Sequence, residues 1–268
     1  MYKAIISDFD GTLADITKNV CEYNLSAIKE MRDKGFQFAL CTGRMTASAL
    51  RVISPLPFKP LVGAFNGSEI VNARTGETLY SSALSAEDCL PLIDYAVSRG
   101  VNCQVYDDTS VYPMHSSVYT EMYGKSCGCP EVYTPDLKSL IIKHGKTPKF
   151  LIIDEPEKVE ALIPEIKEKF GDKFEIAKCY SGMVDFTPKG SNKGAVVGAL
   201  CKIWGIKEEE CIAIGDEFND VSMLRRAGLG IAVANASDGV KAEADYVTER
   251  TNVQGAVGEA IRKFILCE

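Results

Sequence analysis

Short apolar runs, each followed at once by polar residues or glycine, recur along the chain and predict buried β-strands. They occupy residues 4–6, 36–41, 62–65 and 211–214. Runs of this length without polar alternation are typical of strands that are covered on both faces. An amphipathic segment that opens within residues 189–194 and runs to about residue 204 predicts a helix before the last run, and residues 221–227 predict another after it. The pattern therefore predicts an α/β fold with a largely buried sheet.

The middle of the chain has a different pattern, which predicts an inserted α+β region. It reads as a helix at 86–99, strands at 102–106 and 111–112 around a turn at 107–110, a further strand at 149–153, a helix at 157–169, and strands at 174–178 and 183–186. Two helix-strand-strand units would form a separate layer. We expect a core built from residues 1–81 and 188–268, and a cap domain at residues 82–187.

Two acids directly after the first apolar run carry the most chemical information. Asp8 and Asp10 precede Gly11, so both carboxylates should emerge at the carboxyl end of a buried strand, where open α/β sheets bind ligands. Two neighbouring carboxylates raise each other's pKa, so the pair requires a cation, a proton-transfer role or both. A solvated acidic turn is the alternative.

Three further segments supply groups that phosphoryl transfer needs. Thr42, Gly43 and Arg44 follow the second run, with a hydroxyl that could bind a phosphoryl oxygen and a glycine whose backbone can approach a ligand. Lys193 lies at a helix start, where its charge and the helix dipole both favour an anion. Asp216 follows the last strand, shortly before Asn219 and Asp220. Taken singly, each is also compatible with an ordinary turn, solvated lysine or helix cap.

Oxygen ligands with no histidine nearby suit Mg²⁺ better than zinc. Together, the four segments resemble the motifs of the haloacid dehalogenase superfamily of phosphotransferases, and within it the Cof-type sugar-phosphate phosphatases. Asn66-Gly67 and residues 185–188, Asp-Phe-Thr-Pro, are also typical of that subfamily. The resemblance covers essentially the whole chain. It implies a Rossmann-like doubly wound parallel sheet with an inserted α+β cap.

The resemblance also implies a role for each motif residue. Asp8 would be the nucleophile that forms an aspartyl-phosphate, and Asp10 the general acid and base. Mg²⁺ would be held by Asp8, by the backbone carbonyl of Asp10 and by Asp216. The phosphoryl group would be bound by Thr42, Gly43, Arg44, Lys193 and Asn219. Asp220 would orient Lys193 or a metal-bound water.

The implied function is Mg²⁺-dependent hydrolysis of small phosphorylated metabolites, sugar phosphates above all. A sugar phosphomutase of the same superfamily and a non-catalytic metabolite-binding protein are the alternatives. A mutase would need a bisphosphate activator, and a binding protein would show no turnover. Fold alone would not separate these functions, because function belongs to the site.

Composition limits the partners. Thirty basic and 37 acidic residues give a net charge of −7, so no general attraction to nucleic acid or anionic membranes is expected. The first strand begins almost at the first residue, and no apolar run approaches a membrane-spanning length. We therefore expect a cytoplasmic protein whose partner is a small phosphate ester, with no obligate protein partner evident.

The ten cysteines are expected to be free thiols in a reducing compartment. Cys127 and Cys129 with His115 are a weaker alternative, a soft metal site. Within the predicted cap, a group of aromatic and polar residues could stack on sugars, although a role in the core of the cap is favoured. They are Tyr106, Tyr112, Met114, His115, Tyr119 and Tyr123. Arg99 is the single arginine of residues 82–187, which favours monophosphate substrates.

Overall fold

The computed structural model describes residues 1–54 and 56–268, without the side chain of Cys179. The chain divides into two compact units. The first contains Met1–Gly43, Ala49–Leu79 and Asn192–Glu268, and the second contains Arg44–Ser48 and Tyr80–Ser191.

The first unit is built on an eight-stranded sheet in the order β15-β14-β13-β1-β2-β3-β4-β5. Its strands are β1 (Ala4–Ser7), β2 (Gln37–Cys41), β3 (Leu61–Ala64), β4 (Glu69–Asn72), β5 (Thr78–Ser81), β13 (Cys211–Gly215), β14 (Leu229–Ala232) and β15 (Tyr246–Val247). The pairs from β15 to β3 are parallel, and β4 runs antiparallel to β3. The predicted α/β fold with a parallel, doubly wound sheet is confirmed.

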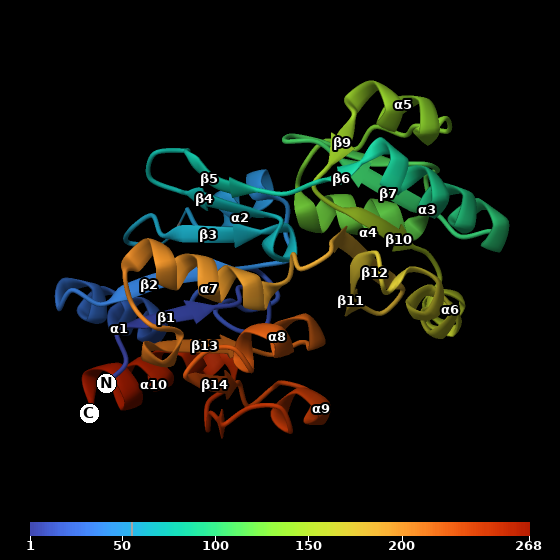
Figure 1. Ribbon diagram of the computed structural model, residues 1–268. Helices are drawn as coiled ribbons and strands as arrows, with labels where there is room; N and C mark the ends of the chain where they lie inside the picture. Colours follow the sequence, from blue (N-terminus) through green and yellow to red (C-terminus); the bar gives the residue numbers. More distant parts are fainter. Residues whose placement is uncertain (55) are drawn as a thin grey trace. The chain divides into compact units, whose positions relative to one another are not determined.

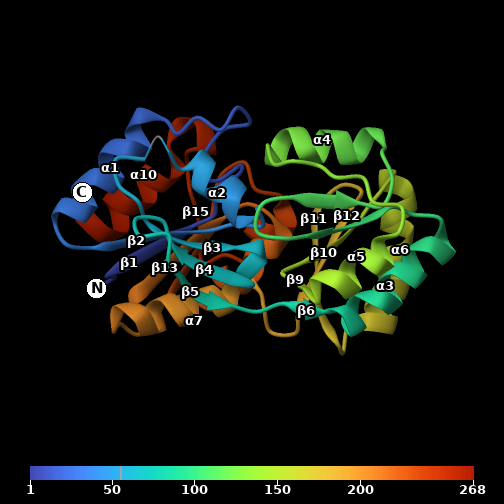
Figure 2. The same cartoon turned by 90° about the horizontal axis from the view of Figure 1, so that it is seen from above.

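Helices cover both faces of this sheet. They are α1 (Glu22–Asp33), α2 (Thr46–Val52, whose first residues belong to the second unit), α7 (Lys193–Trp204), α8 (Val221–Leu224), α9 (Asp238–Lys241) and α10 (Ala256–Ile261), with short turns η1 (Phe65–Gly67), η2 (Glu208–Glu210), η3 (Phe218–Asp220), η4 (Asn252–Gln254) and η5 (Arg262–Leu266). α1 and α10 lie on one face and α7 on the other (Figures 1 and 2). This two-sided cover explains why the strands are continuous apolar runs.

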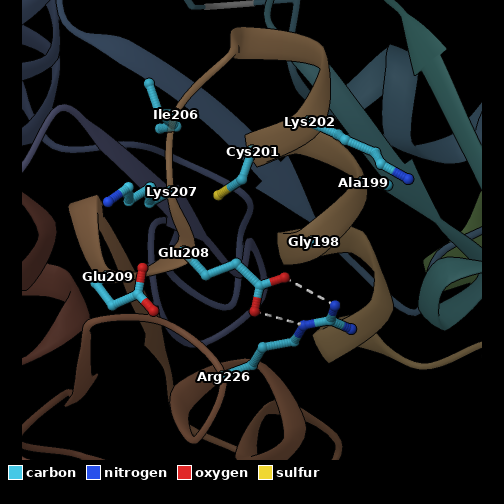
Figure 3. A pocket seen from close by; sticks show the side chains of 9 residues that line it. All are labelled: Gly198, Ala199, Cys201, Lys202, Ile206, Lys207, Glu208, Glu209 and Arg226. Carbon is cyan, nitrogen blue, oxygen red and sulfur yellow. Dashed lines mark hydrogen bonds and ion pairs between the residues drawn. The ribbon is translucent and has the colours of Figure 1, made fainter.

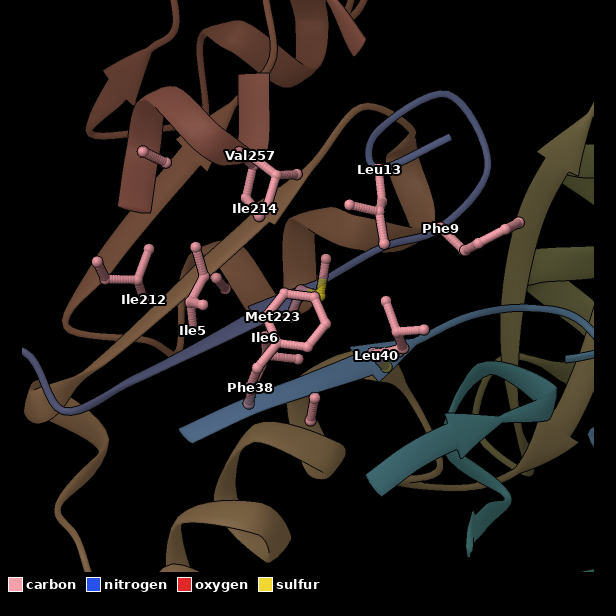
Figure 4. Packing of buried hydrophobic residues seen from close by; sticks show 14 of the residues in the cluster. Ile5, Ile6, Phe9, Leu13, Phe38, Leu40, Ile212, Ile214, Met223 and Val257 are labelled. Carbon is pink, nitrogen blue, oxygen red and sulfur yellow. The ribbon is translucent and has the colours of Figure 1, made fainter. Parts of the chain in front are cut away.

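The core of the first unit is centred on β1. Ile5 and Ile6 are fully buried and pack with Phe38, Ile212 and Val257 from the neighbouring strands and α10 (Figure 4). Because every side chain of β1 is buried, the strand is held firmly up to the residue before Asp8.

The second unit contains a five-stranded sheet in the order β11-β12-β10-β7-β8, all of whose paired strands are antiparallel. Its strands are β7 (Cys103–Tyr106), β8 (Val111–Pro113), β10 (Phe150–Ile153), β11 (Phe174–Tyr180) and β12 (Met183–Pro188), and a small separate sheet joins β6 (Leu84–Ser85) to β9 (Lys146–Thr147). The helices are α3 (Ala86–Arg99), α4 (Val118–Cys127), α5 (Leu137–His144) and α6 (Pro156–Phe170).

Alternation along β7 shows how this sheet is covered. Cys103 and Val105 enter an apolar core to which α3, α5 and α6 contribute. Gln104 and Tyr106 point to the opposite face, where the Tyr106 hydroxyl meets that of Tyr123 on α4, 3.0 Å away. Tyr106 and Met114 are buried, as expected of core residues, and His115 is exposed.

One predicted element differs from the structure. The helix expected at residues 221–227 is only Val221–Leu224, preceded by the turn η3. The backbone of Gly230 passes so close to the Leu224 carbonyl that a Cβ on Gly230 would collide with it. The chain must therefore leave the helix early in order to enter β14. No helix of the described residues is long and apolar enough to cross a lipid bilayer.

Candidate active site

Two adjacent parallel strands place the predicted acids next to one another. β1 pairs with β13, with Ser7 opposite Ile214, so Asp8 and Asp216 follow the ends of neighbouring strands. The backbone N–H of Asp8 continues the ladder by donating to the Ile214 carbonyl at 2.9 Å. The strand order turns from one side of β1 to the other at this pair, which is the place where doubly wound sheets bind ligands.

Lys193 lies at the first turn of α7 and reaches this edge. Asn192 caps the helix by accepting from the Ala195 N–H at 2.9 Å. The Lys193 side chain is 1% exposed, and its Nζ lies 2.6 Å from Oδ1 of Asp8 and 2.5 Å from Oδ1 of Asp220. The ammonium therefore bridges two buried carboxylates.

Asp220 has both carboxylate oxygens engaged. Oδ1 contacts Lys193, and Oδ2 accepts from the backbone N–H groups of Asp216 and Glu217 at 2.9 Å each. Asp220 therefore links the loop after β13 to the lysine of α7. Its two expected roles, to orient Lys193 or a metal-bound water, stay predictions, and the contact with Lys193 fits the first.

Burial dominates the electrostatics of the group. It raises the pKa of Asp8 well above the ordinary value; Asp220, Asp216 and Asp10 raise it further, while Lys193 opposes them. Burial and the charge of Asp220 raise the pKa of Asp216 to about 7. Burial alone would lower the pKa of Lys193, but Asp220 and Asp8 outweigh it, so that pKa is well above its ordinary value. Additional positive charge would stabilise the ionised carboxylates.

The carboxylates are close enough to share a metal ion. Among the described residues, one group of at least three His, Cys, Asp or Glu side chains has ligand atoms within 4.8 Å of one another: Asp8, Asp216 and Asp220. The Thr12 hydroxyl donates to Oδ1 of Asp216 at 2.5 Å and fixes its orientation. All these donors are oxygens, which suits Mg²⁺. The alternative of a metal at Cys127, Cys129 and His115 gains no support.

Asp10 has a partner that the sequence analysis missed. The Nζ of Lys18 lies 2.6 Å from Oδ1 of Asp10. Lys18 has a positive φ of 69°, and the Asp15 carboxylate holds its loop by accepting from the N–H groups of Thr17 and Asn19. The spacing Asp15-x-Thr17 is a local signal for such a turn. The sequence analysis also assigned no catalytic or binding role to Asn66.

Asn66 connects the loops after β2 and β13. Its N–H donates to the Thr42 carbonyl at 3.0 Å, and its Oδ1 accepts from Nδ2 of Asn219 at 3.0 Å. A Cβ on Gly43 would lie 2.9 Å from that Oδ1, so glycine leaves room for the contact. Oδ1 of Asn219 is buried without a hydrogen-bond partner in the described part of the chain. Such an atom suggests that a ligand or water completes the site.

Arg44 is grouped with the second unit. Its Nη1 donates to Oγ of Ser48 at 2.9 Å and to the Ser126 carbonyl at 3.0 Å. Its expected contact with a phosphoryl group stays a prediction, as do the roles expected for the other site residues.

A surface pocket of the first unit contains none of the predicted site residues. It encloses about 670 Å³, is lined by the end of α7 and by η2, and is crossed by an ion pair in which Arg226 donates to both oxygens of Glu208 at 2.8 and 3.0 Å (Figure 3). Its charged lining is mixed, with Glu208 and Glu209 beside Lys202, Lys207 and Arg226. In the described part of the chain, none of the nine cysteines other than Cys179 forms a disulfide bond.

Comparisons with known proteins identify the family of the chain. Residues 5–261 match the family model of haloacid dehalogenase-like hydrolases. A Bacillus subtilis protein named 5-amino-6-(5-phospho-D-ribitylamino)uracil phosphatase is 29% identical over 279 residues, covering 94% of this chain and 95% of its own. A Klebsiella pneumoniae protein named HMP-PP phosphatase is 25% identical over 256 residues, covering 92% and 89%.

Solved structures extend the agreement to three dimensions. A haloacid dehalogenase-like hydrolase from Bacteroides thetaiotaomicron has a TM-score of 0.83 and 27% identity, covering 98% of this chain and 99% of its own. The expected enzyme class, a phosphatase, is confirmed, and the chain belongs to the haloacid dehalogenase-like hydrolase family.

Proposed function

We propose that the protein is a Mg²⁺-dependent phosphomonoesterase that acts on small phosphorylated metabolites, sugar phosphates and related polyol phosphates above all. The observation that carries the proposal is the buried group of Asp8, Asp216 and Lys193 at the carboxyl edge of the sheet. It combines a nucleophile, oxygen donors for a hard cation and a fixed ammonium for an anionic substrate.

The chain's residues fit Mg²⁺ well. Asp8 and Asp216 are the side-chain ligands that we assign, with the backbone carbonyl of Asp10, because both oxygens of Asp220 already have partners. Bound Mg²⁺ supplies positive charge that relieves carboxylate repulsion and draws electrons from the phosphoryl group.

Asp8 starts the reaction. Lys193 occupies its Oδ1, so we assign attack on phosphorus to Oδ2. A bond forms between Asp8 and phosphorus while the bond from phosphorus to the ester oxygen breaks. Asp10 gives a proton to that departing oxygen, so that an alcohol leaves instead of an alkoxide.

The second half reverses the role of Asp10. Its carboxylate takes a proton from water, the water oxygen attacks phosphorus, and the bond to Asp8 breaks to release inorganic phosphate. Lys193 and the Thr42 hydroxyl would hold phosphoryl oxygens throughout, because charge and position supply most of the acceleration in phosphoryl transfer. Asn219 would assist them, while Asp220 keeps Lys193 in place.

The substrate class is supported from two sides. The Bacillus subtilis relative is named for a ribityl phosphate ester. In this chain, Arg99 is paired with Glu165 and lies over the Tyr95 ring, so it already has partners that compete with a second substrate phosphate. Both observations favour monophosphates of sugars or polyols.

A panel of phosphate esters, assayed with Mg²⁺ and with EDTA, tests the proposal. We expect phosphate release from hexose and pentose monophosphates that depends on Mg²⁺ and needs no bisphosphate activator. Isomerised sugar phosphate that appears only with such an activator would identify a mutase instead. Binding of the esters without any turnover would identify a non-catalytic metabolite-binding protein.

A further inference from the structure

Three asparagine side chains hold the loop that follows β1. Nδ2 of Asn235 donates to the Gly11 carbonyl at 2.8 Å, Nδ2 of Asn24 to the Leu13 carbonyl at 3.1 Å, and Nδ2 of Asn252 to the Ala14 carbonyl at 2.9 Å. Asn24 lies on α1, Asn235 follows β14, and Asn252 begins η4. Residues of α1, of the segment after β14 and of η4 therefore all contact one short loop.

The amide oxygens of Asn235 and Asn24 have partners as well. Oδ1 of Asn235 accepts from the Asn252 N–H at 2.8 Å, and Oδ1 of Asn24 accepts from the Gly258 N–H at 2.7 Å. Because the NH₂ group donates and the oxygen accepts, these bonds fix the orientation of the Asn235 and Asn24 amides. Asn235 and Asn252 thus form a relay from η4 to the Gly11 carbonyl.

The held segment touches the proposed metal ligand. Gly11 has a φ of +80°, and a Cβ there would collide with Oδ2 of Asp216. The next residue, Thr12, donates to Oδ1 of the same carboxylate. A shift of the Gly11 peptide would therefore move Asp216 relative to Asp8 and Asp10.

We infer that Asn235 and Asn252 are positioning residues for phosphoryl transfer: together they fix the loop that sets the spacing between Asp10 and Asp216. This inference rests on the proposed function. Asn235 is exposed, so its hydrogen bonds contribute little to global stability. A displacement of about 1 Å among reacting groups costs roughly 10²-fold in rate, so the same bonds matter much more for turnover.

The test compares Asn235→Ala, Asn235→Asp and Asn252→Ala with a matched control, Asn19→Ala. Asn19 is an exposed residue of the same loop whose amide donates only locally, to Oγ1 of Thr17. Asn235→Asp keeps the acceptor for the Asn252 N–H but loses the donor to Gly11. Turnover of p-nitrophenyl phosphate with saturating Mg²⁺, Tm, and hydrogen–deuterium exchange of peptides from residues 8–19 are measured for each.

We expect kcat of Asn235→Ala and Asn235→Asp to fall by roughly 10- to 100-fold, with KM within about twofold and Tm nearly unchanged. Asn252→Ala keeps the backbone N–H that Asn235 accepts and loses the donor to the Ala14 carbonyl, so its kcat should fall by less. Exchange in residues 8–19 should speed up in all three variants. Asn19→Ala should match the parent in kcat. A parent-like kcat in Asn235→Ala, an equal loss in Asn19→Ala, or a kcat loss matched by a fall in Tm would overturn the inference.

Failure of the proposed function gives a different result. In that case the parent protein itself releases no phosphate from any ester. The exchange experiment then decides the inference alone: faster exchange in Asn235→Ala than in the parent and in Asn19→Ala supports the relay, and equal rates overturn it.

Discussion

Asp8 is the side chain whose replacement tests the proposed chemistry most directly. Asp8→Asn keeps the size of the side chain but removes the nucleophilic carboxylate, so kcat should fall by at least ~10⁴-fold. Phosphate release under saturating Mg²⁺ measures the loss. Asp33→Asn is the matched control, because Asp33 is exposed and its ion-pair partner in the described part of the chain is Lys29, one turn away on α1. Parent-like turnover by Asp8→Asn would remove Asp8 from the nucleophile's role.

Lys18 offers a subtler test, because it touches the proposed acid and base. Lys18→Met removes the ammonium that lies 2.6 Å from Asp10. Methionine, like lysine, is a non-glycine residue that must adopt the positive φ of position 18, so the backbone strain does not change. We expect kcat for a hexose phosphate to fall about tenfold, within the range of general acid–base catalysis. Lys18→Arg should recover part of the loss.

A comparison of two leaving groups tests more specifically whether Lys18 acts on proton transfer. In the first turnover, p-nitrophenol needs less help from an acid than a sugar alcohol does, so Lys18→Met should slow its release less. Rapid-quench measurements of the first turnover give both rates. Lys3→Met serves as the control, since Lys3 pairs with Glu210 at the surface. Equal slowing for both substrates would argue against a link between Lys18 and proton transfer to the leaving group.

Among the helices and strands, α7 packs closely against α8, and the position of Lys193 depends on this packing. A Cβ on Gly194 would lie 2.5 Å from the Ser222 carbonyl of α8. Gly194→Ala should therefore push α7 away from α8, destabilise the fold by about 1–3 kcal/mol, and lower kcat by displacing Lys193. Thermal unfolding and phosphatase assays measure the two effects.

Gly198→Ala, one turn further along α7, is the control for that substitution. The nearest atoms to its Cβ would be those at the flexible ends of Arg226 and Glu208, which can move aside. Replacing glycine within a helix should then stabilise the protein by up to about 1 kcal/mol. If both variants behaved alike, the close approach of α7 to α8 would not be what positions Lys193.

The local pattern of apolar and polar residues predicted the positions of most helices and strands. It failed where a contact with a distant segment ends an element. The helix at residues 86–99 matches α3, which begins with a capping box at Ser85 and ends at Gly100. The helix predicted at 221–227 is shorter, because the approach of Gly230 to Leu224 comes from the packing of β14. Periodicity along one segment contains no information about such a contact.

The same limit applies to the site. Strand ends and motif spacing predicted that Asp216 would join Asp8 and Asp10. Asp8 and Asp216 do lie together, but the third carboxylate of their group is that of Asp220. They did not predict that Asn235 would hold the Gly11 carbonyl from 224 positions away. Side-chain hydrogen bonds of that kind follow from tertiary packing, which one sequence does not specify pair by pair.

For the molecule as a whole, the net charge has the same sign as that of a phosphate ester. The chain carries a net charge of −7, so its long-range field does not favour phosphate esters. Attraction must come from the site itself, where Lys193 and a bound cation offset the buried carboxylates. The stability of the metal-free protein should therefore depend on the ionisation of these carboxylates, because no bound cation then offsets their charge.

The sign of the effect follows from Asp216, whose pKa rises from 3.8 to about 7 on folding. Between these values the folded protein holds a proton that the unfolded chain has lost. The free energy of unfolding therefore decreases as pH rises through this window, and the raised pKa of Asp8 acts in the same direction. In EDTA, Tm should fall between about pH 5.5 and pH 8.

Asp216→Asn should flatten that fall, because an amide does not titrate there. Mg²⁺ should raise the Tm of the parent more at about pH 8 than at about pH 5.5, since protons compete with the cation for the same oxygens. In Asp216→Asn this gain should be reduced at both pH values. A parent protein whose Tm in EDTA follows that of Asp216→Asn across the range would show that burial of Asp216 does not control stability.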